Sequence, residues 1–329
     1  MAGNTATRTY TIKKRKIPKV GEIVNYTPDT PSTGYDLSTA KSGHSSAQTI
    51  DGTYDPTTWK IMEVDENGNI TKLLGIGSKD VVFRGSTGYN NGVYLLNDIC
   101  KSRYGNASLG ATARSLNIED IESKMNSKGI AARNANKGDN NNSMQYGATK
   151  KYTSFKKYPA IYAQEKYSGV DVSDVTDGTQ IITGSVNATA QARMNPNGKS
   201  GSDNIYTTLP ETSETTGPSK TNLTCTQTYY SMRSPSSYFD DSNFYSMIFG
   251  TGTTFWLASR CVNCNSSDSY AYFGLRYVSY SYLSGYSLFG SYGNSYYLSY
   301  RLAPVVSLSS GIQVKSGSGT ESDPYAIGK

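Results

Sequence analysis

Residues 270–300 read YAYFGLRYVSYSYLSGYSLFGSYGNSYYLSY. Ten of these 31 residues are tyrosine and seven are serine, and the only charged residue is Arg276. A sparse apolar series runs through the segment: Phe273, Leu275, Val278, Leu283, Leu288 and Phe289. We expect this series to face a core and the tyrosines and serines between its members to face solvent, as in half-buried strands.

Apolar segments on either side of this stretch predict the strands that support it. Residues 254–260 read TFWLASR and residues 303–308 read APVVSL, and both are typical of buried strands. Pro304 suits the first residue of a strand or a position on an edge strand, because its missing N–H weakens the interior of a central strand.

The N-terminal third predicts further strands and turns. Residues 59–64 (WKIMEV) and 70–74 (ITKLL) are two strand candidates, and Asn67-Gly68 between them is a strong hairpin signal. Residues 81–83 form a third candidate strand, and the glycines and asparagines of residues 88–92 predict a turn.

Two helices are expected next. Residues 93–104 place their apolar side chains on one helical face. Asn117 is a candidate N-cap with acidic residues in the first turn after it, and we expect that helix to end near Lys128-Gly129.

The charge of the chain is concentrated at its start. Residues 1–20 carry six Lys and Arg and no acid, so the remaining chain holds 26 basic and 26 acidic residues. We therefore expect a basic N-terminal arm (1–20) on a neutral domain (21–329). A neutral body lacks the electrostatic footprint of nucleic-acid binding. Within the domain, residues 130–222 read as a polar insertion.

Composition near the C-terminus points to a genetic cause. Residues 257–312 contain no Lys, Glu, Gln, Met or Trp, whereas these five types number 46 in the chain. The average rate would place about eight of them there. Codons ending in a pyrimidine encode none of the five, and randomising the adenines of Asn or Tyr codons yields the residues observed. The same mixture of tyrosine, serine and glycine forms antibody paratopes, since tyrosine gives a large contact with few torsions to immobilise.

The motifs resemble a known family. Residues 255–260, 272–278, 288–289 and 303–308, with 88–99 and 113–122 upstream, are similar to C-type-lectin-fold variable proteins, which diversity-generating retroelements of phages and gut bacteria diversify. The resemblance implies an α+β fold, a C-type-lectin-like domain with a twisted antiparallel sheet, two helices and a large loop insertion. It covers residues 20–126 and 225–325 and leaves the insertion uncovered.

The resemblance also implies a ligand-binding protein without catalysis or cofactor. Its variable region would span residues 261–301, with Arg276 and Tyr277 as further candidates. The implied ligand-binding residues are Tyr270, Tyr272, Tyr280, Tyr282, Ser284, Tyr286, Ser287, Ser291, Tyr292, Asn294, Tyr296, Tyr297 and Ser299.

The expected partner is a protein or other macromolecular surface, such as a host cell receptor. Nucleic acid and membrane insertion are not expected, and an oligomer stays open. No signal peptide is recognisable in the given chain, and a virion tail or a cell surface is the expected location. The alternative is a structural surface, pilin-like or phage-tail subunit without diversified ligand binding.

The sequence departs from the pattern of this family in two places. Residues 301–304 (RLAP) replace the family's Gly-Leu-Arg-Pro step, and the calcium-binding signatures of sugar-binding lectins are absent.

Three other groups of residues are candidates for chemistry. Cys261 and Cys264 form a lone CxxC, for which a local disulfide or free thiols are favoured over zinc. His44 is expected in a solvated loop, and Asp240-Asp241 in a polar turn rather than a glycosidase pair.

Overall fold

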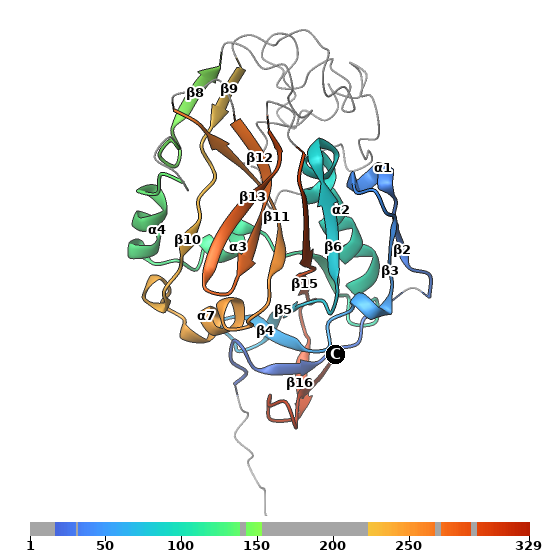
Figure 1. Ribbon diagram of the computed structural model, residues 1–329. Helices are drawn as coiled ribbons and strands as arrows, with labels where there is room; N and C mark the ends of the chain where they lie inside the picture. The colour runs from blue at the N-terminus through green and yellow to red at the C-terminus, as the bar shows by residue number, and fades with distance from the viewer. Residues whose placement is uncertain (1–16, 31, 139–142, 153–222, 267–270, 291–294) are drawn as a thin grey trace, which may run out of the picture.

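The structure is a computed structural model that describes residues 17–30, 32–138, 143–152, 223–266, 271–290 and 295–329. Most of the predicted arm (1–20) and most of the predicted insertion (130–222) lie outside these residues. The chain is an α+β protein with two large β-sheets (Figure 1). The expected single antiparallel sheet is therefore divided in two, and two strand pairs are parallel.

A seven-stranded sheet holds the two ends of the described chain together. Its strand order is β16-β17-β1-β4-β5-β15-β7. The first strand, β1, pairs in parallel with the last, β17, and Val24 lies opposite Tyr325. The strands are β1 (Ile23–Asn25), β4 (Trp59–Val64), β5 (Ile70–Gly75), β7 (Thr112–Ser115), β15 (Pro304–Ser307), β16 (Gln313–Ser316) and β17 (Tyr325–Gly328).

A six-stranded sheet contains the tyrosine-rich segment. Its order is β10-β13-β12-β11-β14-β6, and the long hairpin β12–β13 lies next to β11. In Figure 1 this sheet stands upright above β4, β5 and β16. The strands are β6 (Asp80–Arg84), β10 (Met232–Arg233), β11 (Phe255–Cys264), β12 (Ala271–Ser279), β13 (Tyr282–Gly290) and β14 (Tyr297–Arg301).

The strands predicted from local patterns are confirmed. β4 and β5 form the expected hairpin, and Gly68 in its turn has φ 77°, a conformation that glycine adopts without steric cost. Asp65 stabilises the same turn by accepting the backbone N–H groups of Asn67 and Asn69. Pro304 is the first residue of β15, as expected.

Helix α2 (Gly85–Tyr104) corrects the prediction of a turn at residues 88–92. These residues are helical because the helix packs against both sheets, contacting β7 of one and β11 of the other. A Cβ atom on Gly92 would overlap Leu275 of β12, and one on Gly88 would lie 3.1 Å from Phe83 of β6. The glycines therefore permit a close helix–sheet contact, and tertiary packing overrides their low helix propensity.

The second predicted helix is divided in two. Asn117 caps α3 (Ile118–Glu122) in a capping box with Asp120, which confirms its N-terminus. The expected end near Gly129 is wrong, because α3 stops at Glu122 and Asn126 caps a new helix, α4 (Ser127–Asn134). The Asn126 N–H also donates to the Tyr238 carbonyl oxygen, which holds the chain where its direction changes.

Shorter elements complete the described residues. Gln48 of β3 lies beside the free edge of β6, where its side-chain amide donates to the Val82 carbonyl oxygen at 3.1 Å and accepts the Val82 N–H at 3.0 Å. This amide takes the place of a neighbouring strand. The remaining elements are α1 (Thr39–Ser42), α7 (Ser242–Phe249), β2 (Tyr35–Leu37), β3 (Gln48–Ile50), β8 (Thr149–Tyr152), β9 (Leu223–Thr226) and the 3₁₀ turns Gly52–Tyr54 and Ser236–Tyr238.

The contact of α2 with β12 yields a stability prediction. Gly92→Val adds a branched side chain against Leu275, so we expect the free energy of unfolding to fall by ~1–3 kcal/mol. Lys101→Val on an exposed position of α2 is the matched control, because it changes helix propensity without adding a buried contact. Urea unfolding of both variants measures the difference, and equal losses would contradict the packing argument.

Candidate functional site

The β12–β13 hairpin separates core side chains from exposed tyrosines. Val278 and Leu283 are cross-strand partners, and both are fully buried. Ser279 and Tyr282 form the last pair before the turn, so the turn itself consists of Tyr280 and Ser281. The alternation predicted for this segment is thus present at the tip of the hairpin.

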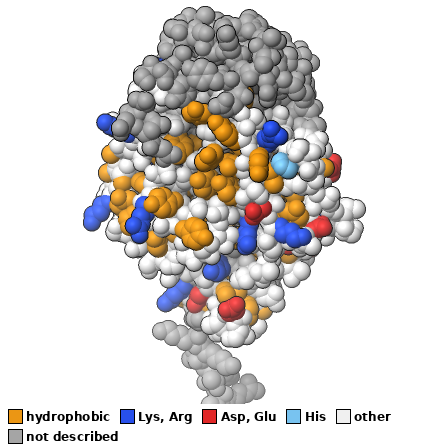
Figure 2. Space-filling view, viewed as in Figure 1, with side chains coloured by type: hydrophobic (Ala, Val, Ile, Leu, Met, Phe, Trp, Pro, Cys, Tyr) orange, Lys and Arg blue, Asp and Glu red, His pale blue; other side chains and the backbone are white. Residues whose placement is uncertain are grey.

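Five exposed tyrosines lie on this hairpin and at the start of β14. We call them the tyrosine surface: Tyr280, Tyr282, Tyr286, Tyr296 and Tyr297. Ile17 is the only other large hydrophobic side chain that is exposed among the described residues. Figure 2 shows hydrophobic and tyrosine side chains gathered over the middle of this face, with charged groups mainly around them.

Tyrosines of β13 and of the segment before β14 contact one another. The rings of Tyr286 and Tyr296 meet edge to face with centroids 6.4 Å apart. The backbone of Tyr296 is held on both sides, because its N–H donates to the Leu288 carbonyl oxygen and its own carbonyl oxygen accepts the N–H of Gly85. A fixed backbone limits how much conformational freedom the surface would lose on binding.

A half-buried aromatic layer supports the tyrosine surface. The Tyr300 ring lies 4.6 Å from the rings of both Trp256 and Tyr277. Trp256 is fully buried and donates its indole N–H to the Val81 carbonyl oxygen. Burial, followed by the nearby phenol of Tyr277, raises the pKa of Tyr300. Aromatic packing therefore extends from the core to the half-buried rings of Tyr300 and Tyr277.

His44 lies at the edge of the surface, with its ring 5.9 Å from the ring of Tyr297. It lies in the loop after α1 and is partly exposed, and its ring also accepts the backbone N–H of Ser46. More than 250 residues separate the two rings in sequence, and no local pattern could have paired them.

Arg276 belongs to the reverse side of the hairpin and is buried. Its guanidinium lies 4.5 Å from the Tyr230 ring centroid and donates to the Thr228 carbonyl oxygen. The Tyr230 hydroxyl donates to Glu122 of α3 at 2.6 Å. Burial raises the pKa of Tyr230, so its phenol stays protonated and remains a donor. Arg276 is thus a packing residue in this conformation rather than part of the exposed surface.

The remaining predicted ligand-binding residues are less accessible or not described. Tyr272, Ser287 and Ser299 are half-buried, as is the further candidate Tyr277. Ser284 is 4% exposed, so the expectation of an accessible side chain is wrong there. It pairs with Tyr277 across the hairpin, where neighbouring side chains cover it. Tyr270, Ser291, Tyr292 and Asn294 lie outside the described residues.

The other candidate groups lie in structural positions. Cys261 and Cys264 are buried and form no disulfide with each other. Within the described ranges, no cluster of three or more His, Cys, Asp or Glu side chains could hold a metal ion. Asp241 caps α7 by accepting the N–H groups of Asn243 and Phe244. No helix of the described part is long and apolar enough to cross a membrane.

Backbone strain occurs at the hairpin tip. Tyr280 has φ 51° and is the only described residue other than glycine with a positive φ. Two-residue hairpin turns favour glycine or asparagine at such a position, because a Cβ atom makes it costly. Because the Tyr280 side chain is 64% exposed, its packing within the protein offsets little of this cost. Strain of this kind concentrates at functional sites.

Comparisons with known proteins found no match, whether with protein-family profiles, curated proteins or solved structures.

The strain at Tyr280 can be measured. We expect Tyr280→Gly to raise the free energy of unfolding by up to ~1 kcal/mol, because glycine adopts a positive φ without steric conflict. Ser281→Gly is the control: its φ is not positive, so it relieves no strain and lowers stability through the entropy of the unfolded chain. A Tyr280→Gly variant less stable than the parent in urea unfolding would refute the strain argument.

Adjacent residues of β13 should differ sharply in tolerance. Tyr282→Ser removes a half-exposed ring and should cost ~1 kcal/mol or less. Leu283→Ala opens a cavity in the core and should cost ~2–5 kcal/mol. Thermal unfolding of the two variants tests whether the hairpin accepts replacement of its tyrosines, and similar losses would show that the exposed rings are structural.

Proposed function

We propose that the protein is a non-catalytic display protein that binds varied macromolecular ligands through the tyrosine surface. In this proposal the domain is a C-type-lectin-fold variable domain, and adenine-directed mutagenesis diversifies the surface. The ligand is a protein or another macromolecular surface, such as a receptor on a host cell. The location that suits this role is a virion tail or a cell surface.

One observation carries the proposal. The tyrosine surface contains every large hydrophobic side chain that is exposed among the described residues, Ile17 excepted, and all five are among the ligand-binding residues that the resemblance implies. Soluble proteins rarely expose contiguous apolar surface without a binding role. The underlying core residues stay buried, so the frame does not require the exposed rings.

The chemistry of the surface suits varied ligands. Tyrosine contributes a large, stiff ring and one hydroxyl that can donate or accept, so it binds many partners at low entropic cost. Along β12 and β13 the one charged side chain, Arg276, is buried. Recognition would therefore rely on shape, stacking and neutral hydrogen bonds.

The gene provides the direct test. A near-identical repeat of the codons for residues 261–301 should lie nearby, with a reverse transcriptase gene, and should differ from them only at adenines of the repeat. Sequencing of the locus checks this. Differences at other bases would contradict diversification by this route.

Self-association separates display from the alternative structural subunit. A display protein should show no association through the tyrosine surface, whereas a structural subunit would bury these rings against its neighbours. Sedimentation velocity of the full chain and of the variant Tyr282→Ser/Tyr286→Ser/Tyr297→Ser makes the comparison. Assembly that disappears in the variant would favour the structural role and overturn display.

A further inference from the structure

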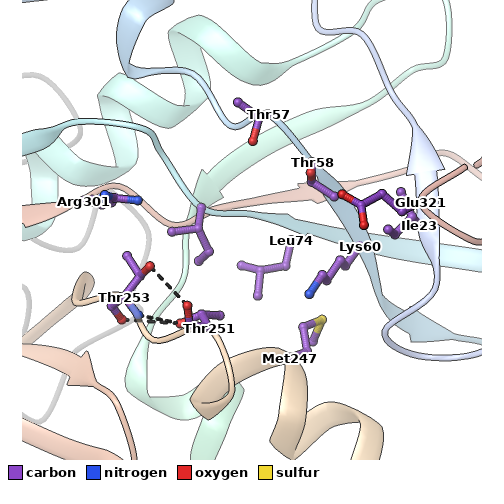
Figure 3. A pocket seen from close by; sticks show the side chains of 11 residues that line it. Ile23, Thr57, Thr58, Lys60, Leu74, Met247, Thr251, Thr253, Arg301 and Glu321 are labelled. Carbon is purple, nitrogen blue, oxygen red and sulfur yellow. Dashed lines mark hydrogen bonds between the residues drawn. The ribbon is translucent and has the colours of Figure 1, made fainter.

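A cavity of about 350 Å³ lies between the seven-stranded sheet, α7 and the end of β14, and it takes no part in the function proposed above (Figure 3). Leu74 of β5 and Met247 of α7 line it and are almost completely buried. A second cavity of about 510 Å³ shares Ile23, Lys60 and Met247 with the first. The two therefore form one groove, with Lys60 at their junction.

Among the described residues, no acid pairs with Lys60, a cation of this groove. Lys60 is a partly buried residue, and no described residue forms an ion pair or hydrogen bond with its side chain. Its neighbour in the same sheet behaves differently, because Lys72 of β5 pairs with Glu63 at 2.7 Å. Partly buried charges are costly without a partner, so Lys60 offers a binding contact that its own chain leaves unused.

A second cation lies at the other end of the cavity. The Arg301 guanidinium is 41% exposed, and its Nε is 3.9 Å from Asp80, which is too far for a hydrogen bond. In contrast, Arg114 and Arg133 hold their carboxylates at 2.6 and 2.5 Å. Arg301 thus remains able to donate to a ligand.

The rest of the lining combines hydroxyls with an apolar floor. Thr251 and Thr253 hydrogen-bond to each other at the wall, and Thr57 and Thr58 lie opposite them in Figure 3. Glu321 is an exposed acid of the lining on the side of Thr58. The lining thus holds two cations and one acid, and Asp80 lies beside Arg301 outside it, so the attraction for an anion is centred on Lys60.

We propose that this groove binds a small organic anion that carries an aliphatic portion. The anionic group, a carboxylate or a phosphate monoester, lies at Lys60 and receives further hydrogen bonds from threonine hydroxyls or Arg301. The aliphatic portion packs on Leu74 and Met247. The volume falls within the range of sites that bind small molecules, and a few polar groups over an apolar floor are typical of them.

Isothermal titration calorimetry of the full chain tests the proposal with three probes of equal chain length: hexanoate, hexyl phosphate and neutral hexanol. We expect at least one anion to bind with a Kd of ~1 mM or tighter and hexanol to bind at least ~tenfold more weakly. The two anions distinguish a carboxylate site from a phosphate site. Equal binding of hexanol, or no binding of either anion at ~10 mM, would overturn the proposal.

Variants assign the binding to Lys60. Lys60→Met keeps the apolar stem and removes the charge, and it should weaken anion binding at least ~tenfold, whereas Lys60→Arg should retain it. Lys315→Met, on an exposed position of β16 in the same sheet, is the matched control. Unfolding curves show whether each variant is folded. Unchanged binding by a folded Lys60→Met, or equal weakening by Lys315→Met, would place the anion elsewhere and refute the assignment.

Discussion

The close contact between α2 and β12 is the constraint on which the six-stranded sheet depends. Two glycines let the helix approach until Gly92 meets Leu275, and Leu275 pairs with Tyr286 across the hairpin. Cross-strand partners point to the same face of a sheet. The residue that the helix fixes in place therefore lies directly beside an exposed tyrosine. A similar arrangement is found on the next strand, β11. There the buried Trp256 ring packs against the half-buried ring of Tyr300, which in turn packs against Tyr277.

Alternate residues of the hairpin differ in their contribution to stability and in their exposure. Val278 and Leu283 hold the strands to the core that contains α7, while the rings next to them contribute little to it. The backbone of Tyr280 has a positive φ, a conformation that favours glycine or asparagine over tyrosine. Such an arrangement lets side chains change without altering the frame. It is the property that a diversified binding surface needs.

Local patterns predicted the elements that local interactions determine. The capping box at Asn117 and the turn at Gly68 satisfy their own backbone groups, so their sequence signals held. The glycines at 88 and 92 led to a wrong prediction of a turn. Their role is in the packing of α2 against Phe83 of β6 and Leu275 of β12, which the pattern of residues 88–92 does not show. Alternation is also a local pattern. It predicted the exposure of most tyrosines but not the burial of Ser284, which neighbouring side chains cover. The groove at Lys60 joins five elements distant in sequence, and nothing in their local patterns indicated it.

Gln48 affects whether two molecules of the protein can associate through the edge strand β6. A bare strand edge invites a second molecule to extend the sheet, and on β6 that edge would lie one strand from Tyr297. The glutamine amide occupies the hydrogen-bonding groups of Val82 at this position. A second molecule therefore finds these backbone groups already occupied and cannot pair with them to extend the sheet. The exposed tyrosine rings can then lie near this edge with less risk that neighbouring molecules extend the sheet into aggregates.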